Sequence, residues 1–244
     1  MSSSISNPSA TGASTTTIAT SSATATAAAQ DASGQQPAAA AASASELAGA
    51  KIELFNALRR FPDFPIPGIV FLDIMPLFLD PAMHATLLRA LELQVQSFSA
   101  GSAAAAAAAA AAVAFKPDVV AGLDARGFLF GPSLALRLDA AFVPVRKKGK
   151  LPGPCVTAAY EKEYGQDFFQ VQEGAIKPGQ KVLVVDDIIA TGGSASAAGE
   201  LVRKLGGELV GYLFLLEIAP LKGKEKLGDV PVITLLEEAE YPTA

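Results

Sequence analysis

The sequence of 244 residues contains a single cysteine, Cys155, and a single histidine. One cysteine excludes an internal disulfide framework and a cysteine-based zinc site, and it fits a reducing compartment. No window holds about eighteen consecutive strongly apolar residues, so we expect no membrane-spanning helix. The net charge of −5 provides no general attraction to nucleic acids or to anionic membranes. We therefore expect neither of them as a partner.

Residues 1–45 lack lysine and arginine and consist mostly of Ser, Thr, Ala and Gln. Such a segment buries too little apolar surface to offset its ordering entropy, which predicts a disordered low-complexity tail before a folded domain of residues 46–244. Organellar transit peptides share the serine-rich start but are normally rich in arginine. The expected location is the cytoplasm, with organellar targeting by the tail as the alternative. Residues 99–114, with ten consecutive alanines, form a second low-complexity segment, which we interpret as an insertion of undetermined conformation.

Neither G-x-x-x-x-G-K-[ST] nor G-x-G-x-x-G occurs in the chain. Instead, the apolar run Val182–Val185 predicts a buried strand, and Asp186 and Asp187 follow it directly. The loop of residues 190–194, Ala-Thr-Gly-Gly-Ser, then leads into a helical pattern. Unpaired N–H groups at a helix start and close backbone approach at glycine create an anion site. The pattern predicts a phosphate site flanked by two carboxylates that accept hydrogen bonds from vicinal hydroxyls.

This order of strand, acidic pair and T-G-G-S loop resembles the phosphoribosyl pyrophosphate signature of the phosphoribosyltransferases. An ordinary strand-to-helix turn with two solvent-facing aspartates is the alternative interpretation. The resemblance implies that phosphoribosyl pyrophosphate binds to Asp186, Asp187, Ala190, Thr191, Gly192, Gly193 and Ser194.

Apolar residues from Leu54 to Phe61 recur at helical spacing and predict a helix that Pro62 ends. Residues 61–74, Phe-Pro-Asp-Phe-Pro-Ile-Pro-Gly-Ile-Val-Phe-Leu-Asp-Ile, then predict an extended segment with a short strand. This string is similar to the hood of adenine phosphoribosyltransferases, where Leu72 departs from the arginine of some members. The resemblance implies that Phe71 stacks on the purine and that the backbone of Val70 contacts its edge. A purely structural Phe71 in the core is the alternative.

A second strand, turn and helix begins at residues 118–123 and continues through Asp124-Ala-Arg-Gly127, which resembles the pyrophosphate loop of the family. The resemblance implies that Asp124 belongs to the substrate site and that Arg126 neutralises the pyrophosphate. Four basic residues follow within positions 146–150. A solvated surface loop is the plain interpretation of such a run. Beside a phosphorylated substrate, Arg146, Lys147 and Lys150 stabilise a leaving pyrophosphate, and the run forms a mobile lid.

The string Tyr160-Glu-Lys-Glu-Tyr-Gly165 contains the x-E-Y-G motif of the adenine enzymes. The resemblance selects Glu163 to exchange a proton with the purine and Tyr164 to contact the base. It also assigns Ile218, at the end of an apolar strand, to the wall of the base pocket. The catalytic residues implied in this way are Glu163, Arg126 and Lys150.

Alternating strands and helices predict a single α/β domain with a parallel-sheet core flanked by helices and a small hood, as in type I phosphoribosyltransferases. The resemblance implies transfer of the 5-phosphoribosyl group from phosphoribosyl pyrophosphate to adenine, giving AMP and pyrophosphate. It also implies a homodimer and Mg²⁺, which is held mainly by the substrate, with Asp186 as a candidate ligand. A regulatory module that binds phosphoribosyl pyrophosphate and a transferase for a 6-oxopurine are the alternative functions.

Overall fold

The computed structural model describes residues 32–64, 67, 70–101, 116–162 and 165–237. Its contacts divide the chain into two units, residues 1–39 and 40–244. Helix α1 begins at Ala32, so residues 32–45 are helical where their composition predicts disorder. Alanine, which has the highest helix propensity, dominates this stretch. Residues 1–31 and the alanine run of residues 102–115 lie outside the described residues, and the predictions made for them stay untested.

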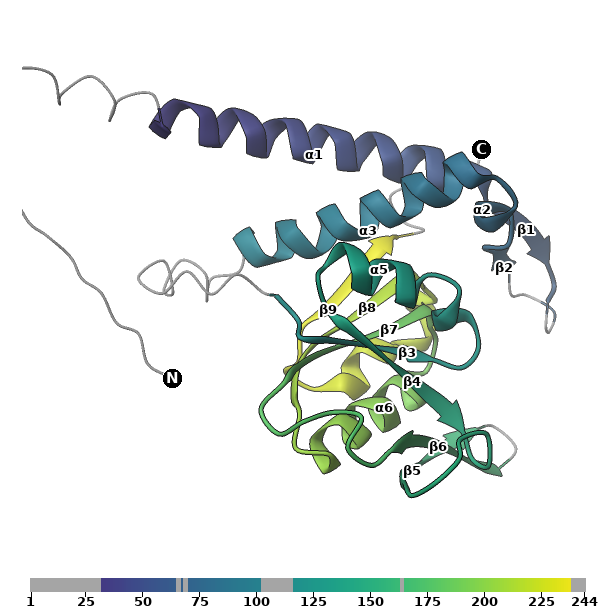
Figure 1. Cartoon of the computed structure of the whole chain (residues 1–244). Coiled ribbons are helices and arrows are strands. Elements are labelled where there is room, and N and C mark those ends of the chain that lie inside the picture. The colour runs from purple at the N-terminus through teal and green to yellow at the C-terminus, as the bar shows by residue number, and fades with distance from the viewer. Residues whose placement is uncertain (1–31, 65–66, 68–69, 102–115, 163–164, 238–244) are drawn as a thin grey trace, which may run out of the picture. The chain divides into compact units, whose positions relative to one another are not determined.

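The second unit is built on a seven-stranded sheet with the order β5-β6-β4-β3-β7-β8-β9 (Figure 1). The five strands from β4 to β9 in this order are parallel, which confirms the predicted parallel core. The β5–β6 hairpin adds two antiparallel strands at one edge, so the whole sheet is mixed. The strands are β3 (Val119–Leu123), β4 (Ala141–Lys147), β5 (Cys155–Lys162), β6 (Gly165–Gln172), β7 (Lys181–Ile189), β8 (Glu208–Glu217) and β9 (Val232–Leu236).

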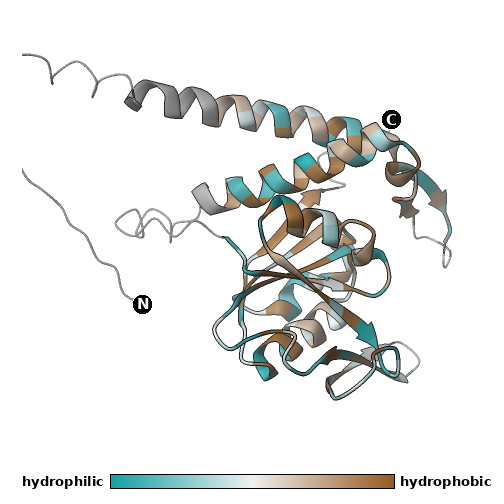
Figure 2. Cartoon of the chain, in the orientation of Figure 1, coloured by the Kyte–Doolittle hydropathy of each residue, from teal (hydrophilic) through white to brown (hydrophobic). Residues whose placement is uncertain are grey.

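Helices cover both faces of this sheet. Leu183 and Val185 of β7 belong to a core that includes residues of α1, α3 and α5, whereas Val182 and Val184 belong to a second core with α6. Hydrophobic residues accordingly predominate along the central strands (Figure 2). The α-helices are α1 (Ala32–Ala57), α2 (Pro76–Leu79), α3 (Pro81–Gly101), α5 (Gly131–Arg137) and α6 (Gly193–Lys204), and the 3₁₀ helices are η1 (Arg126–Phe128), η2 (Ala219–Leu221) and η3 (Gly223–Leu227). Among the described helices, none combines the length and apolar character that crossing a bilayer requires.

A separate two-stranded sheet forms the hood, with β1 (Arg59–Pro62) antiparallel to β2 (Val70–Asp73). The predicted short strand is therefore present, but the predicted helix through Phe61 is wrong because α1 ends at Ala57. Arg59 lies opposite Asp73 in the ladder, and its Nη2 is 2.6 Å from Asp73 Oδ2. Pairing with β2 therefore overrides the helical periodicity of the sequence.

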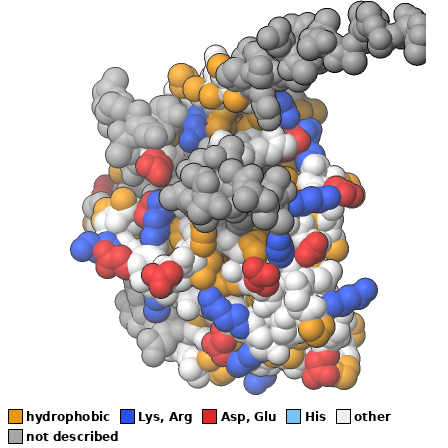
Figure 3. All heavy atoms as spheres, turned by 90° about the vertical axis from the view of Figure 1, so that its left-hand side faces the viewer, with side chains coloured by type: hydrophobic (Ala, Val, Ile, Leu, Met, Phe, Trp, Pro, Cys, Tyr) orange, Lys and Arg blue, Asp and Glu red, His pale blue; other side chains and the backbone are white. Residues whose placement is uncertain are grey.

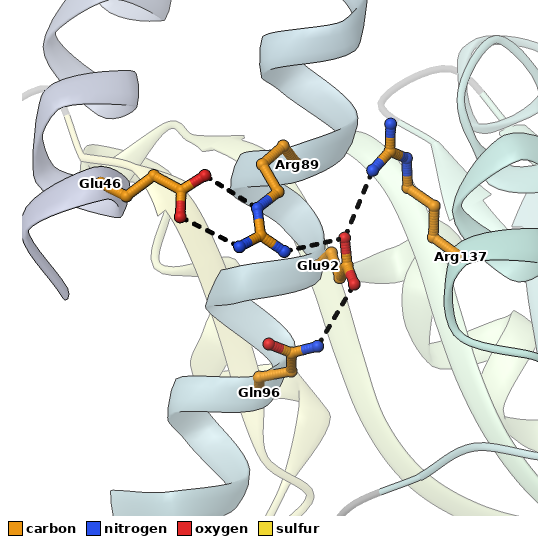
Figure 4. Close-up of polar contacts among 5 residues, drawn as sticks. All are labelled: Glu46, Arg89, Glu92, Gln96 and Arg137. Carbon is orange, nitrogen blue, oxygen red and sulfur yellow. Dashed lines mark hydrogen bonds and ion pairs between the residues drawn. The ribbon is translucent and has the colours of Figure 1, made fainter. Parts of the chain in front are cut away.

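Charged side chains connect the helices on the outer side of the first core (Figure 4). Arg89 of α3 donates to Glu46 of α1 from Nε at 2.8 Å and from Nη2 at 3.0 Å. Glu92 accepts from Arg89 and from Arg137 of α5, at 3.4 and 3.3 Å. Arg89 lowers the pKa of Glu46, chiefly through their hydrogen bonds. Because Glu46, Arg89 and Arg137 are largely exposed, these ion pairs add little to the stability of the protein.

Basic and acidic side chains are interspersed over the face of the described residues shown in Figure 3. Elsewhere in the described residues, Lys116 and Asp139 form an exposed ion pair, in which Nζ and Oδ2 lie 2.6 Å apart. Opposite charges that lie side by side screen each other, so this face presents a mixed electrostatic surface.

Candidate functional site

The candidate site lies where two neighbouring strands send their following helices to opposite faces of the sheet. Strand β3 continues through η1 into α5, and its neighbour β7 continues into α6. Helices α5 and α6 contribute to different cores. The loops that leave the carboxyl ends of β3 and β7 therefore diverge, and this is the position at which open α/β sheets bind ligands.

A cavity of about 190 Å³ occupies this position. It brings together Arg126 from the turn after β3, the acidic pair near the carboxyl end of β7 and the loop after β7, the groups that the sequence predicts. The prediction that the strand ends at Val185 is wrong, because pairing with β8 continues β7 through both aspartates to Ile189. Phe214 of β8 also lines the cavity. The lining residues are Arg126, Asp186, Asp187, Ile188, Ile189, Ala190, Thr191, Gly192, Gly193, Ser194, Ala195 and Phe214.

The loop of residues 190–194 provides the anion-binding part of this cavity. Gly192 has a φ of +76°, which turns the chain from β7 into α6. The N–H of Ser196 donates the first helical bond to the Gly192 carbonyl at 2.9 Å. The N–H groups before Ser196 have no intrahelical partners and carry the positive end of the helix dipole. The geometry therefore suits a phosphate group.

Glycine is required in this loop for a second reason. A Cβ atom at Gly192 would overlap the carbonyl oxygen of Gly223, which begins η3. A Cβ atom at Gly223 would in turn overlap the carbonyl oxygen of Ala190. The phosphate loop thus packs backbone against backbone on η3, a support that no local pattern in the sequence indicates.

Asp187 is buried and Asp186 is partly buried, which argues against the interpretation of two solvent-facing aspartates. Asp187 is 3% exposed, and its Oδ2 lies 2.7 Å from Nε of Arg126. Asp186 Oδ1 accepts a hydrogen bond from the N–H of Asp187 at 2.9 Å. Burial raises the pKa of Asp186 well above its usual range, and the neighbouring charge of Asp187 adds to this shift. Burial also raises the pKa of Asp187, but Arg126 opposes it.

The turn after β3 lies against β7. A Cβ atom at Gly127 would be only 2.7 Å from the carbonyl oxygen of Val185, so glycine is needed for this close approach. The peptide bond between Asp124 and Ala125 is cis. Arg146 Nε donates to Asp124 Oδ2 at 3.1 Å, and Arg146 Nη1 donates to the Lys150 carbonyl at 3.2 Å. Asp124 therefore connects this turn with the basic run after β4.

Four residues that the sequence assigns to the phosphoribosyl pyrophosphate site do not line this cavity in the part of the chain that the structure describes. These are Asp124, Arg146, Lys147 and Lys150. Lys147 and Lys150 are exposed in a turn closed by the bond from the Lys150 N–H to the Lys147 carbonyl at 3.2 Å. The hydrophilic carboxyl end of β4 is visible in Figure 2.

The hood extends to the same site. Phe71 is only partly buried, its ring meets Phe64 edge to face at 5.2 Å, and the Arg126 guanidinium carbon lies 6.0 Å from its centroid. Val70 is 48% exposed. The ring of Phe71 is therefore not enclosed in the core, and it lies beside Arg126. The Ile218 N–H donates to the Ile189 carbonyl at 2.9 Å, which places Ile218 beside the carboxyl end of β7. Glu163 and Tyr164 lie outside the described residues.

Known proteins match this chain over most of its length. A model of the phosphoribosyl transferase domain matches residues 93–235. The adenine phosphoribosyltransferase of Yarrowia lipolytica is 53% identical over 188 residues, which cover 77% of this chain and 96% of that protein. Adenine phosphoribosyltransferase 1 of Saccharomyces cerevisiae is 50% identical over 184 residues, which cover 75% and 91%. The chain belongs to the adenine phosphoribosyltransferase family.

Solved structures of the adenine phosphoribosyltransferase family share this fold. The crystal structure of the Saccharomyces cerevisiae enzyme, complexed with D-2,5-dideoxy-2,5-imino-altritol 1,6-bisphosphate and adenine, is 48% identical. It matches with a TM-score of 0.69 over 78% of this chain and 99% of that chain. The Giardia lamblia enzyme complexed with 9-deazaadenine is 31% identical with a TM-score of 0.60, over 79% and 97%. The type I phosphoribosyltransferase fold predicted from the sequence is confirmed.

Proposed function

We propose that this chain transfers the 5-phosphoribosyl group of phosphoribosyl pyrophosphate to adenine, forming AMP and pyrophosphate in purine salvage. The observation that carries this proposal is the cavity at the carboxyl end of β7, where the buried Asp187 and the partly buried Asp186 adjoin a glycine-containing helix start. Backbone N–H groups with the Thr191 and Ser194 hydroxyls hold the 5-phosphate, and Asp186 and Asp187 accept from the ribose hydroxyls. Family members of about 50% identity that carry the name adenine phosphoribosyltransferase support adenine as the base.

In the reaction, the bond between the anomeric carbon and the pyrophosphate oxygen breaks, and a bond from that carbon to a purine nitrogen forms. Positive charge develops on the ribose in the transition state, and the carboxylates of Asp186 and Asp187 stabilise it. Arg126 stabilises the charge of the departing pyrophosphate, together with Arg146, Lys147 and Lys150 of the basic run. The proton lost by the purine nitrogen passes to Glu163.

The residues of the site fit Mg²⁺ as a partner of the substrate. Among the described residues, no group of three or more His, Cys, Asp or Glu side chains is placed to hold a metal ion. Mg²⁺ is commonly bound through one or two carboxylates and the substrate's own phosphates. Asp186 and Asp187 supply such carboxylates beside the phosphate loop. Bound there, Mg²⁺ would neutralise charge on the diphosphate.

Phe71 provides a test of base recognition. We propose that its ring stacks on adenine, while Val70, Tyr164 and Ile218 complete the base pocket. Replacing Phe71 with Ala should raise the KM for adenine about 10-fold, because stacking on an aromatic ring is worth about 1–3 kcal/mol per base. The KM for phosphoribosyl pyrophosphate should change less than about 2-fold, and Phe71→Tyr, which keeps the ring, should behave like the wild type. Steady-state kinetics with each substrate varied measure both values, and an unchanged adenine KM in Phe71→Ala contradicts the stacking role.

We further propose a cytoplasmic homodimer. The single cysteine supports a reducing compartment. Leu129 and Leu136, on the segment from η1 to α5, are 37% and 82% exposed. Exposed leucines on one segment suit contact with a second copy of the chain. Light scattering coupled to size-exclusion chromatography measures the assembly state.

A panel of bases tests the proposed function. The purified protein is incubated with phosphoribosyl pyrophosphate, Mg²⁺ and either adenine, hypoxanthine, guanine or xanthine, and nucleotide formation is followed. AMP from adenine alone is the expected result. Preference for a 6-oxopurine contradicts the choice of base, and binding of phosphoribosyl pyrophosphate without any product contradicts an enzymatic role.

A further inference from the structure

Helix η3 packs against the backbone of the phosphate loop, residues 190–194. A Cβ atom at Gly192 would overlap the Gly223 carbonyl oxygen and lie 3.2 Å from Cβ of Lys226. In the other direction, a Cβ atom at Gly223 would overlap the Ala190 carbonyl oxygen and lie 2.9 Å from the Gly192 nitrogen. Because glycine stands on both sides, the two backbones touch directly, and the position of the loop depends on the position of η3.

Different interactions hold the two ends of η3. At its carboxyl end, Leu227 is buried and belongs to the same core as Ala198 of α6. Near its amino end, Lys224 Nζ lies 2.5 Å from Oε2 of Glu217, the last residue of β8. Lys224 directly follows Gly223, so this ion pair acts on the end of η3 that touches the loop.

The pair of Lys224 and Glu217 is shorter and less exposed than two neighbouring ion pairs. Its side chains are 34% and 16% exposed. Lys224 Nζ also lies 3.8 Å from Oε1 of the more exposed Glu237, and the exposed pair of Lys222 and Glu225 spans 3.9 Å. Solvent screens exposed pairs more strongly than partly buried ones. We therefore expect the pair of Lys224 and Glu217 to contribute most to holding η3.

Glu217 is fixed relative to the strand from which the loop starts. It lies opposite Ile189 in the ladder between β8 and β7, and the N–H of Ile218 donates to the Ile189 carbonyl at 2.9 Å. Ile189 is the last residue of β7 and immediately precedes the loop. The loop is therefore supported from its own starting strand, through Glu217, Lys224 and Gly223.

We propose that Lys224 and Glu217 are positioning residues of the phosphate site: their ion pair holds η3 against the loop and thereby fixes the backbone N–H groups that bind the 5-phosphate. The inference rests on the proposed function, which makes a ribose 5-phosphate group the ligand of this loop. Neither side chain lines the cavity in the described part of the chain, so the pair acts through the backbone contact of Gly223 with Gly192. A loop that is fixed before binding loses less conformational entropy when its ligand binds.

Replacing Lys224 with Met tests the proposal, because Met keeps most of the aliphatic stem and removes the charge. The Kd for ribose 5-phosphate, measured by calorimetric titration, and the KM for phosphoribosyl pyrophosphate should both rise about 3- to 10-fold, the effect of losing one charged hydrogen bond that acts indirectly. The KM for adenine should stay at the wild-type value, because the pair acts on the phosphate side of the site. Lys224→Arg keeps the charge and should show wild-type values of all three constants.

Variants of the partner residue and of the neighbouring pairs make the test specific. Glu217→Gln breaks the same ion pair and should weaken ribose 5-phosphate binding to the same extent. Adding Lys224→Met to Glu217→Gln should cause no further loss, because the interaction between the two residues is already absent. The matched controls are Glu237→Gln and Lys222→Met, which break the longer, exposed pairs and should leave Kd unchanged.

A merely structural ion pair would give a different result. A lower melting temperature of Lys224→Met with an unchanged Kd for ribose 5-phosphate overturns the inference, and so does an equal rise in the KM values of both substrates. Either result leaves the proposed function standing if the wild type forms AMP. If the wild type neither binds phosphoribosyl pyrophosphate nor forms AMP, the proposed function itself fails and the inference fails with it. Should Lys224→Met not fold, Glu217→Gln, which keeps the shape of its side chain, decides the question, and an unchanged Kd in that variant overturns the inference.

Discussion

Replacing Asp186 with Asn should raise the melting temperature of the protein and reduce kcat/KM about 100-fold or more. The raised pKa of Asp186 means that the fold disfavours its charged form. An acid with a raised folded-state pKa contributes stability below its unfolded pKa, and that contribution is lost as the pH rises through the folded value. At neutral pH the charged Asp186 therefore destabilises the fold. Asn removes this cost and still accepts from the Asp187 N–H, but it loses the charge that the ribose and the metal need.

The matched control for this prediction is Asp187→Asn. Asp187 is paired with Arg126, so its removal leaves a cation without its partner and should not stabilise the protein. Thermal unfolding with EDTA between pH 5 and 8 measures the effect, and a gain of about 1 kcal/mol corresponds to about 2–4 °C. The advantage of Asp186→Asn should grow as the pH rises. A melting temperature below that of the wild type at every pH would show that the buried charge is not a cost.

Replacing Gly192 with Ala should both destabilise the protein and reduce kcat/KM for phosphoribosyl pyrophosphate about 100-fold or more. The residue has a φ of +76°, which costs an L-amino acid about 1–2 kcal/mol. Its Cβ atom would also overlap the Gly223 carbonyl, and no side-chain rotation relieves a contact between a Cβ and a backbone atom. The loop must move away from η3, and its N–H groups then move from the phosphate position.

Gly174 separates the two costs, because it has the same φ of +76° but a Cβ atom there would meet no other atom within 4 Å. Gly174→Ala should therefore lose stability through backbone strain alone and keep its affinity for phosphoribosyl pyrophosphate. Differential scanning calorimetry and steady-state kinetics on both variants measure the comparison. Equal kinetic losses in the two variants would show that the packing of the loop on η3 does not matter for the site.

The sequence predicts the phosphate side of the site well because its determinants are local. A buried strand, two acids, a glycine turn and a helix start follow one another directly, so the chain order itself brings residues 186–194 together. The parallel core follows in the same way from alternating strands and helices.

What depends on distant partners could not be predicted. Strand β1 forms only because β2 lies beside it, and local periodicity indicates a helix there instead. The support of Gly192 by Gly223 joins segments that are far apart in the chain. The burial of Asp187 and its pairing with Arg126 likewise follow from the sheet order, which places β3 beside β7.

The pairing of β3 with β7 also has a consequence for folding. Val119 lies opposite Val182, and β4, β5 and β6 come between them in the chain. Closing so large a loop costs entropy before any contact compensates for it, and non-local pairings of this kind slow folding. The two halves of the site meet only when this long-range pairing is complete. A nascent chain that ends before residue 181 therefore contains Arg126 without its acidic partner, and catalytic competence arises only after nearly the whole domain has been synthesised.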